Sequence, residues 1–230
     1  MKISYPKKFC SSRNKLILQY CEWKKVLHVW CCDSPYTKDK YDNKWGPLLY
    51  REIDGVCSDQ LWIDLDKESV EFLNTKKTEF KNSRVQYIDM NQLENLNYIP
   101  DVIIFWEVIE HLMNLEVALT NLKKVMSADT LLLISTPNCF SFPNFINTLF
   151  GFEQMHEDHK VFFSYWYLKN LLLFNGLVEH DFYFTKIDLE IELNIFGKIV
   201  KALETLMIYI SKGFCDTLLL IAKKDNTWSQ

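Results

Sequence analysis

Short apolar runs recur along the chain and alternate with longer segments whose apolar residues have helical spacing. The run "DVIIFW" at 101–106 is continuous, as expected of a strand that is covered on both faces. Residues 115–126 instead place apolar side chains on one face of a helix. The sequence predicts strands at 25–30, 61–65, 85–88, 101–106, 131–135, 177–184 and 214–222. It predicts helices near 47–53 and over 67–75, 115–126, 165–174 and 190–210.

This alternation is typical of an α/β fold, Rossmann-like, in which a mostly parallel sheet carries helices on both faces. No repeat or linker interrupts it, so we expect one domain over residues 1–230. Residues 1–23 are expected to form a loop and a short helix, and residues 31–44 an irregular polar segment. Residues at about 188–212 form a helical elaboration with an apolar face. A lid or a homodimer contact is our first interpretation of that face, an interfacial membrane helix the second, and burial against the sheet the default.

Composition narrows the classes of function. The net charge is −4 and there is no basic block, which argues against a nucleic-acid-binding surface. The seven cysteines form no C-x-x-C pair, which favours reduced thiols in a cytoplasmic protein over disulfides or a metal clip. The first residues lack the apolar run of a signal peptide, and no stretch reaches the ~20 apolar residues of a membrane span.

Polar residues gather where the predicted strands end. In open α/β sheets, ligands bind beyond the carboxyl ends of the strands, so these residues are candidates for a binding site. Asp64 ends the second strand, and a carboxylate there can accept two hydrogen bonds from a ribose diol. The other strand ends carry Asp33, Asp89, the group Glu107, Glu110 and His111, and "STPN" at 135–138. Together they predict a nucleoside-binding edge.

Three longer segments carry a family pattern. They are "LWIDLDKESVEFLN", "DVIIFWEVIEHLMNLEVALTNLKKVMSADTLLLISTPN" and "HEDHKVFFSYWYLKNLLLFNG". Together they resemble class I S-adenosylmethionine-dependent methyltransferases, from about Lys25 to Phe184. The third segment resembles relatives in surface-polysaccharide and small-metabolite pathways.

The resemblance implies a seven-stranded sheet whose last strand is antiparallel, and S-adenosylmethionine as cofactor. It implies contacts to the cofactor from residues at four strand ends. These are Cys31 and Asp33 in the first loop, Asp64 and Leu65 at the ribose, Asp89 and Met90 at the adenine, and Glu107 and Val108 at the sulfonium side.

The first loop departs from the family, which usually has glycines there. Trp30, Cys32 and Ser34 stand at the positions where glycines are expected. A sulfonium nucleoside has no phosphate, so the loop needs close backbone approach but no phosphate nest. If Trp30 points into the core the cofactor pocket survives, and if it points to the carboxyl edge it fills the pocket.

Histidines are the candidate catalytic bases, because a hydroxyl or ammonium acceptor must lose a proton. The resemblance puts His159 first, and His111 and His156 are alternatives; a capping or packing role for His111 and a solvated loop for the others remain open. His28 and His180 are expected to be structural. A metal site from His156, Asp158 and His159 lacks a clear fourth ligand, so no metal is expected.

Other residues near the site have two interpretations each. Tyr36, Tyr50 and Arg51 could reach over the site or be surface residues. The aromatic stretch at 141–152 could form a wall of an acceptor pocket or simply pack.

The sequence therefore predicts a methyltransferase that acts on an oxygen or nitrogen nucleophile of a small polar acceptor. The resemblance suggests a sugar, a nucleotide-sugar or a phospho-metabolite, in the synthesis of a capsule or another surface polysaccharide. The alternative is a catalytically inactive methyltransferase-fold protein that serves as a binding or partner subunit. Trp30 and the missing glycines favour that alternative.

Overall fold

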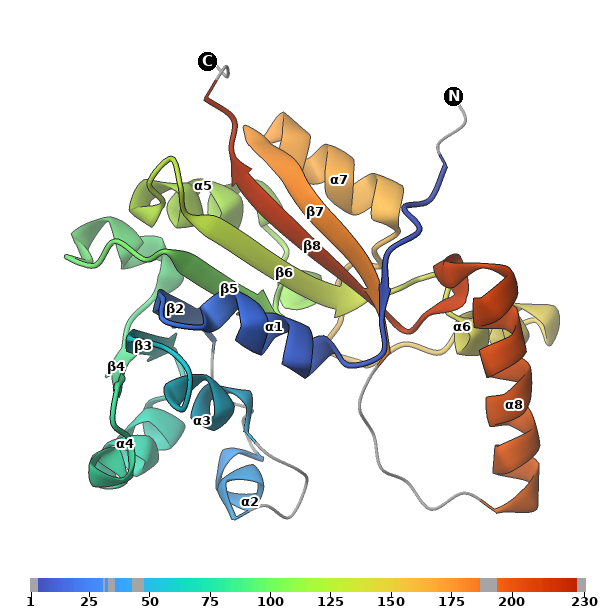
Figure 1. The fold of residues 1–230 in the computed structure, drawn as a ribbon, viewed down its shortest axis with the longest axis horizontal. Coiled ribbons are helices and arrows are strands. Elements are labelled where there is room, and N and C mark those ends of the chain that lie inside the picture. The colour runs from blue at the N-terminus through green and yellow to red at the C-terminus, as the bar shows by residue number, and fades with distance from the viewer. Residues whose placement is uncertain (1–3, 31, 33–35, 43–47, 187–193, 227–230) are drawn as a thin grey trace.

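In the computed structural model, which describes residues 4–30, 32, 36–42, 48–186 and 194–226, one eight-stranded sheet runs through the molecule (Figure 1). The strand order is β1-β7-β8-β6-β5-β2-β3-β4. Neighbouring strands are parallel except at β8, which is antiparallel to both β6 and β7. The strands are β1 (Phe9–Cys10), β2 (Lys25–Val29), β3 (Asp59–Asp64), β4 (Ser83–Tyr87), β5 (Val102–Trp106), β6 (Leu131–Pro137), β7 (Leu177–Thr185) and β8 (Thr217–Lys224).

Eight α-helices are described around this sheet, and short 3₁₀ helices lie between some of the elements. The α-helices are α1 (Arg13–Cys21), α2 (Thr37–Tyr41), α3 (Leu49–Asp54), α4 (Lys67–Thr75), α5 (Leu115–Val125), α6 (Phe142–Leu149), α7 (Tyr165–Phe174) and α8 (Ile195–Ile210). The 3₁₀ helices are η1 (Lys77–Glu79), η2 (Met90–Asn95), η3 (Ile109–His111) and η4 (Lys212–Phe214). The predicted α/β class and the antiparallel last strand are confirmed.

Three elements correct the sequence-based prediction. The two-residue β1 adds an eighth strand by pairing in parallel with the end of β7. Helix α2 lies in the segment that was expected to be irregular, and α6 lies in the aromatic stretch after β6. These elements have two, five and eight residues, so a periodic pattern has little length in which to appear.

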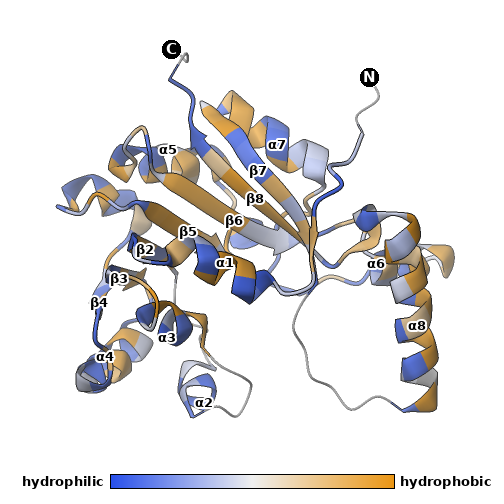
Figure 2. Cartoon of the chain, viewed as in Figure 1, coloured by the Kyte–Doolittle hydropathy of each residue, from blue (hydrophilic) through white to orange (hydrophobic). Residues whose placement is uncertain are grey.

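The central strands are buried on both faces because alternate residues face different helices. In β2, Leu27 and Val29 contact the core under α5 and α7, whereas Val26 contacts the core under α1 and α3. At the β3–β4 edge, Trp62 packs in a third apolar cluster with residues of α4. Figure 2 shows the apolar colouring that continues along the inner strands. This packing fixes the carboxyl ends of β2, β3 and β5 next to one another.

Helix α8 stands beside α6, away from the sheet (Figure 1). Its outward side chains include Ile195, Tyr209 and Ile210, which are 80%, 83% and 67% exposed. Burial against the sheet, the default interpretation, therefore holds only near the end of the helix, where Ile208 packs in the core. The lid and homodimer interpretations stay predictions, and residues 187–193 of the elaboration lie outside the described part of the chain. No helix in the described ranges combines the length and apolar character needed to cross a bilayer.

Candidate active site

A cavity of about 550 Å³ opens at the carboxyl ends of β2, β3 and β5. The predicted residues that line it are Asp64, Leu65, Glu107, Val108 and His111. Cys32, from the first loop, also lines it, whereas the predicted Cys31 and Asp33 lie outside the described residues. The structure thus brings residues from several strand ends together at one cavity, where an open α/β sheet binds its ligand.

Asp64 is held in place by the backbone around it. Its Oδ2 accepts a hydrogen bond from the Cys32 amide at 2.8 Å, and its Oδ1 accepts one from the Asp66 amide at 2.9 Å. Burial raises the pKa of Asp64, and the two amides oppose that shift because they stabilise the carboxylate. The Leu65 amide and the Cys32 thiol also favour the charged form, and the carboxylate lines the cavity, where it can accept a hydrogen bond from a ligand hydroxyl.

The next strand end lies beside Asp64. The Ile88 amide, just after β4, donates to the Asp64 carbonyl oxygen at 3.2 Å. Asp89 and Met90 are the next two residues along the chain. Asp89 caps η2 by accepting from the Asn91 amide, and Met90 is buried in the core. Neither lines the 550 Å³ cavity, and their predicted place at an adenine stays a prediction.

Trp30 combines both orientations that the sequence left open. Its ring packs against the core under α5 and α7, and it also lines the cavity. Its φ is +54°, the left-handed region that glycine adopts without strain. Glu107 at the end of β5 also has a positive φ, +52°. Backbone strain of this kind concentrates at functional sites, which supports the assignment of this edge.

His28 lies in β2 and lines the same cavity, but its side chain is buried at 2% exposure. Its Nδ1 has no hydrogen-bond partner within the described residues. Burial lowers the pKa of His28 to about 3, so the ring is neutral near pH 7. The structure supports the structural role that was expected for it, and His180 in β7 is exposed.

We expect His28 to make the protein sensitive to acid. Its pKa is lower in the folded state than the usual 6.5, so the unfolded state gains a proton first as pH falls. Stability from this group is fully present above pH 6.5 and is lost between pH 6.5 and about 3. The measurement is the free energy of unfolding in urea at pH 7, 5.5 and 4.5. As the pH falls, this free energy should drop more steeply in the wild type than in the His28→Asn variant, by up to about 1.4 kcal/mol per pH unit. Parallel pH profiles of the two proteins would contradict the assignment.

Glu107 is paired with a residue that the sequence did not indicate. Arg13 of α1 lies with Nη1 2.7 Å from Glu107 Oε1, and its guanidinium stacks 4.5 Å from the Trp106 ring centroid. Nη1 has no hydrogen-bond partner among the described residues, because the Glu107 oxygen does not lie along one of its N–H bonds. The contact is therefore an ion pair without a hydrogen bond. The Ser135 hydroxyl donates to the same Oε1 at 2.7 Å. These contacts fix the Glu107 carboxylate at the cavity wall.

The three candidate histidines form one cluster. The ring centroids of His111 and His159 are 4.7 Å apart, and His156 lies 5.3 Å from His159 and 6.5 Å from His111. The Glu110 carbonyl oxygen accepts from the amides of Lys160 and Val161, at 2.7 and 3.2 Å. These two backbone bonds hold the loop that carries His159 against η3, which carries His111.

Burial and neighbouring groups shift the pKa values of two residues in this part of the site. Burial lowers the pKa of His159, and the neighbouring His111 and His156 lower it further. Burial and the nearby Glu107 carboxylate raise the pKa of Glu110. Asp158 is exposed, and its Oδ2 lies 3.8 Å from His156 Nδ1, too far for a hydrogen bond. Its carboxylate therefore makes no hydrogen bond to the His156 ring.

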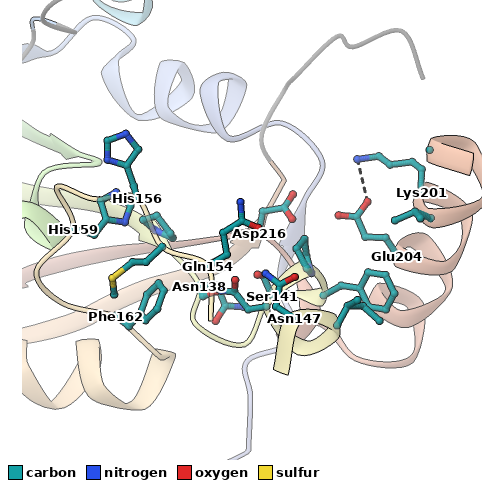
Figure 3. A pocket seen from close by; sticks show the side chains of 18 residues that line it. Asn138, Ser141, Asn147, Gln154, His156, His159, Phe162, Lys201, Glu204 and Asp216 are labelled. Carbon is teal, nitrogen blue, oxygen red and sulfur yellow. Dashed lines mark hydrogen bonds and ion pairs between the residues drawn. The ribbon is translucent and has the colours of Figure 1, made fainter. Parts of the chain in front are cut away.

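A second cavity, of about 720 Å³, lies on the other side of the histidines, between α6, α8 and the loop before Phe163. His156 and His159 line it at one end (Figure 3). Lys201 and Glu204 of α8 line the opposite end and are joined at 3.0 Å. Polar side chains between them include Asn138, Ser141, Asn147, Gln154 and Asp216. The stretch at 141–152 thus forms part of a pocket wall, one of its two interpretations.

The remaining candidates divide between the cavity and the surface. Tyr50 is buried and lines the 550 Å³ cavity. Tyr36 is 56% exposed, and the Arg51 guanidinium lies 3.4 Å from Glu79, away from the cavity lining. Of the three, only Tyr50 therefore contributes to the site.

The chain resembles known proteins in sequence pattern and in fold. The family model described as a methyltransferase domain matches residues 44–189, more than half of the chain. No curated protein matches it. A S-adenosylmethionine-dependent methyltransferase structure from Archaeoglobus fulgidus is similar, with 17% identity, a TM-score of 0.55, and 92% of this chain and 94% of that chain covered.

Two further structures contain S-adenosylhomocysteine. One is the N-methyltransferase NodS from Bradyrhizobium japonicum, with 12% identity, a TM-score of 0.54 and coverage of 92% and 85%. The other is magnesium protoporphyrin IX methyltransferase from Synechocystis, with 11% identity, a TM-score of 0.56 and coverage of 92% and 81%. Such identities show a shared fold, and the match over residues 44–189 shows the family. The chain therefore belongs to the methyltransferase-domain family and has the class I S-adenosylmethionine-dependent methyltransferase fold.

Proposed function

We propose that the chain transfers a methyl group from S-adenosylmethionine to an oxygen or nitrogen of a small polar acceptor. One observation carries this proposal: a histidine cluster lies between two cavities. The cavity at the strand ends has a carboxylate that suits a ribose, and the other cavity is lined by amides and aromatic rings. A donor and an acceptor in the two cavities would meet at the histidines.

The strand-end cavity fits the cofactor in size and in chemistry. Its volume of about 550 Å³ falls within the roughly 300–1,000 Å³ of small-molecule sites. Asp64 with Leu65 would hold the ribose, and Glu107 with Val108 would face the sulfonium, whose positive charge a carboxylate favours. Asp89 and Met90 would flank the adenine, and Cys31 and Asp33 the methionine part. The bound cofactor supplies an electrophilic methyl group on sulfur.

Alignment is the main task of such an enzyme, because the transfer is an in-line displacement. The acceptor must also lose its proton. His159 is our first candidate for the group that takes it, because its lowered pKa keeps the ring neutral. His111 is 4.7 Å from it and faces the cofactor cavity, and the exposed His156 faces the acceptor cavity.

The acceptor cavity favours an uncharged polar molecule over a phosphate. Its charged lining residues are one lysine and two carboxylates: Lys201, Glu204 and Asp216. The side chains of Asn147 and Gln154 make no hydrogen bond within the described residues and are available to hydroxyl groups. A sugar fits this lining better than a nucleotide-linked sugar or a phospho-metabolite, because both of these carry phosphate groups. Synthesis of a surface polysaccharide is consistent with such an acceptor.

Calorimetry and mass spectrometry test this function together. We expect S-adenosylmethionine to bind the purified chain with micromolar affinity, and a pool of small metabolites to contain at least one compound that gains a single methyl group only when the chain is present. A chain that binds neither S-adenosylmethionine nor S-adenosylhomocysteine would contradict the proposal.

The second candidate function is an inactive binding or partner subunit. The observation that favours it is Trp30, whose ring lines the cofactor cavity where the family has a glycine. Trp30→Gly removes the ring and relieves the positive φ. If S-adenosylmethionine binds this variant but not the wild type, the inactive subunit is the correct function.

A further inference from the structure

We infer that Glu110, His111 and His159 bind one divalent transition-metal cation at the junction of the two cavities. One possible ligand atom from each of these residues lies within 4.8 Å of the other two. The sequence led us to expect no metal, and the triplet considered there was His156, Asp158 and His159. The fold instead joins two adjacent residues of η3 with one residue of a loop that lies about fifty positions later.

The backbone prepares this arrangement. Glu110 and His111 are neighbours in η3, and the loop that carries His159 is fixed to η3 through the Glu110 carbonyl oxygen. Ligand bonds of about 2.0–2.2 Å allow two ligand atoms of one ion to lie at most about 4.4 Å apart. Atoms that are up to 4.8 Å apart can meet this limit by small side-chain rotations.

The Glu110 carboxylate gives a second, independent observation. Its side chain is 1% exposed, and its Oε1 has no hydrogen-bond partner among the described residues. A buried carboxylate oxygen without a partner is costly, and a bound cation would compensate that cost. The other oxygen, Oε2, accepts from the Thr136 hydroxyl at 3.0 Å, which is the kind of outer contact that orients a metal ligand.

The donor set indicates the class of metal. Two imidazoles and one carboxylate suit zinc, iron, cobalt and manganese, and this combination is known from catalytic sites that keep positions open for other ligands. Glu107, close enough to raise the pKa of Glu110, adds negative charge nearby. Cysteine sulfur atoms, which would favour a closed structural zinc site, are not among the ligand atoms of this group.

The position of the cation gives it a role, and this part rests on the proposed function. An acceptor hydroxyl or amine in the 720 Å³ cavity could enter an open position of the ion, because His159 lines that cavity. A cation lowers the pKa of an oxygen that it binds. His159 would then act as a metal ligand rather than as the base. The cation would promote transfer of the acceptor proton to His156, which lines the same cavity, while the acceptor atom takes the methyl group and S-adenosylhomocysteine leaves.

Calorimetric titration of the chelator-treated full chain with Zn²⁺, and absorption spectra with Co²⁺, test the site without a methyl acceptor. We expect one Zn²⁺ per chain and Co²⁺ bands typical of nitrogen and oxygen ligands. Three variants remove a ligand each: His111→Ala, His159→Ala and Glu110→Gln. Each should weaken Zn²⁺ binding by more than about tenfold, because loss of a residue that only supports a ligand already weakens metal binding about 10–100-fold. The matched control is His180→Ala, which changes an exposed histidine of β7 and should bind as the wild type does.

The outcomes separate this inference from the proposed function. Zn²⁺ binding that is absent overturns the inference, and so does binding that is equal in the wild type and all three ligand variants, because the ion would then lie at another site. Circular dichroism melting identifies any variant that has lost its fold, and Glu110→Gln keeps the side-chain shape. Binding of S-adenosylmethionine is measured on the same samples. A protein that binds Zn²⁺ but no S-adenosylmethionine contradicts the proposed function alone, and a protein that binds S-adenosylmethionine but no Zn²⁺ contradicts the metal site alone.

Discussion

Replacement of Arg13 by methionine is expected to lower the free energy of unfolding by about 2–3 kcal/mol. Methionine keeps most of the stem that covers Trp106 but removes the charge beside Glu107. Breaking a buried ion pair typically costs about 3–5 kcal/mol, and we reduce this value because the Glu107 side chain is 29% exposed. For a chain of this length the melting temperature should fall by roughly 4–12 °C in a thermal scan.

The matched control is Arg51→Met. Arg51 also pairs with a glutamate and lies over an aromatic ring, but its side chain is 42% exposed. Exposed pairs contribute about 0–1 kcal/mol, so this variant should melt close to the wild type. If the two variants melt at the same temperature, Arg13 has no special role in holding Glu107 at the cavity.

The second large effect is expected at Asp64. Asp64→Asn should weaken S-adenosylmethionine binding roughly 100-fold, because hydrogen bonds to a charged group contribute about 1.5–3 kcal/mol. Asparagine keeps one acceptor oxygen for the amides of Cys32 and Asp66, so the loop keeps part of its anchor. Calorimetric titration of the variant with S-adenosylmethionine measures the change.

Asp59→Asn is the control for this experiment. Asp59 begins the same strand, β3, and its carboxylate pairs with Arg84 at the opposite end from the cavity. The Asp59→Asn variant should bind the cofactor with the affinity of the wild type. An Asp64→Asn variant that binds as tightly as the Asp59→Asn variant would exclude Asp64 from the ribose contact.

The hydrophobic pattern predicted the sheet well because most of its strands are buried, with the edge strand β4 as the exception. All seven predicted strands are present, and α4 and α7 have the predicted bounds. The pattern missed β1 because a two-residue strand depends on its partner β7 and has no periodicity of its own. It missed α6 because this helix has only eight residues, and its aromatic residues were interpreted as a pocket wall or as packing.

The candidate site was predictable only where it follows from the ends of strands. Asp64, Glu107 and His111 come directly after strands, and parallel strands bring such residues to one edge. Arg13 belongs to a helix that precedes the first central strand, so no local spacing links it to Glu107. The approach of His159 to His111 depends on two backbone hydrogen bonds to Glu110, which no side-chain pattern reveals.

The histidine cluster with a cavity on each side has a kinetic consequence. One cavity opens among residues of α1, α3 and the first loop, and the other opens between α6 and α8. If the two cavities hold the cofactor and the acceptor as proposed, spent cofactor would exchange for fresh cofactor while an acceptor stays bound. The two substrates would then add in either order, and an acceptor that bears several reactive groups would be modified repeatedly during one residence on the protein.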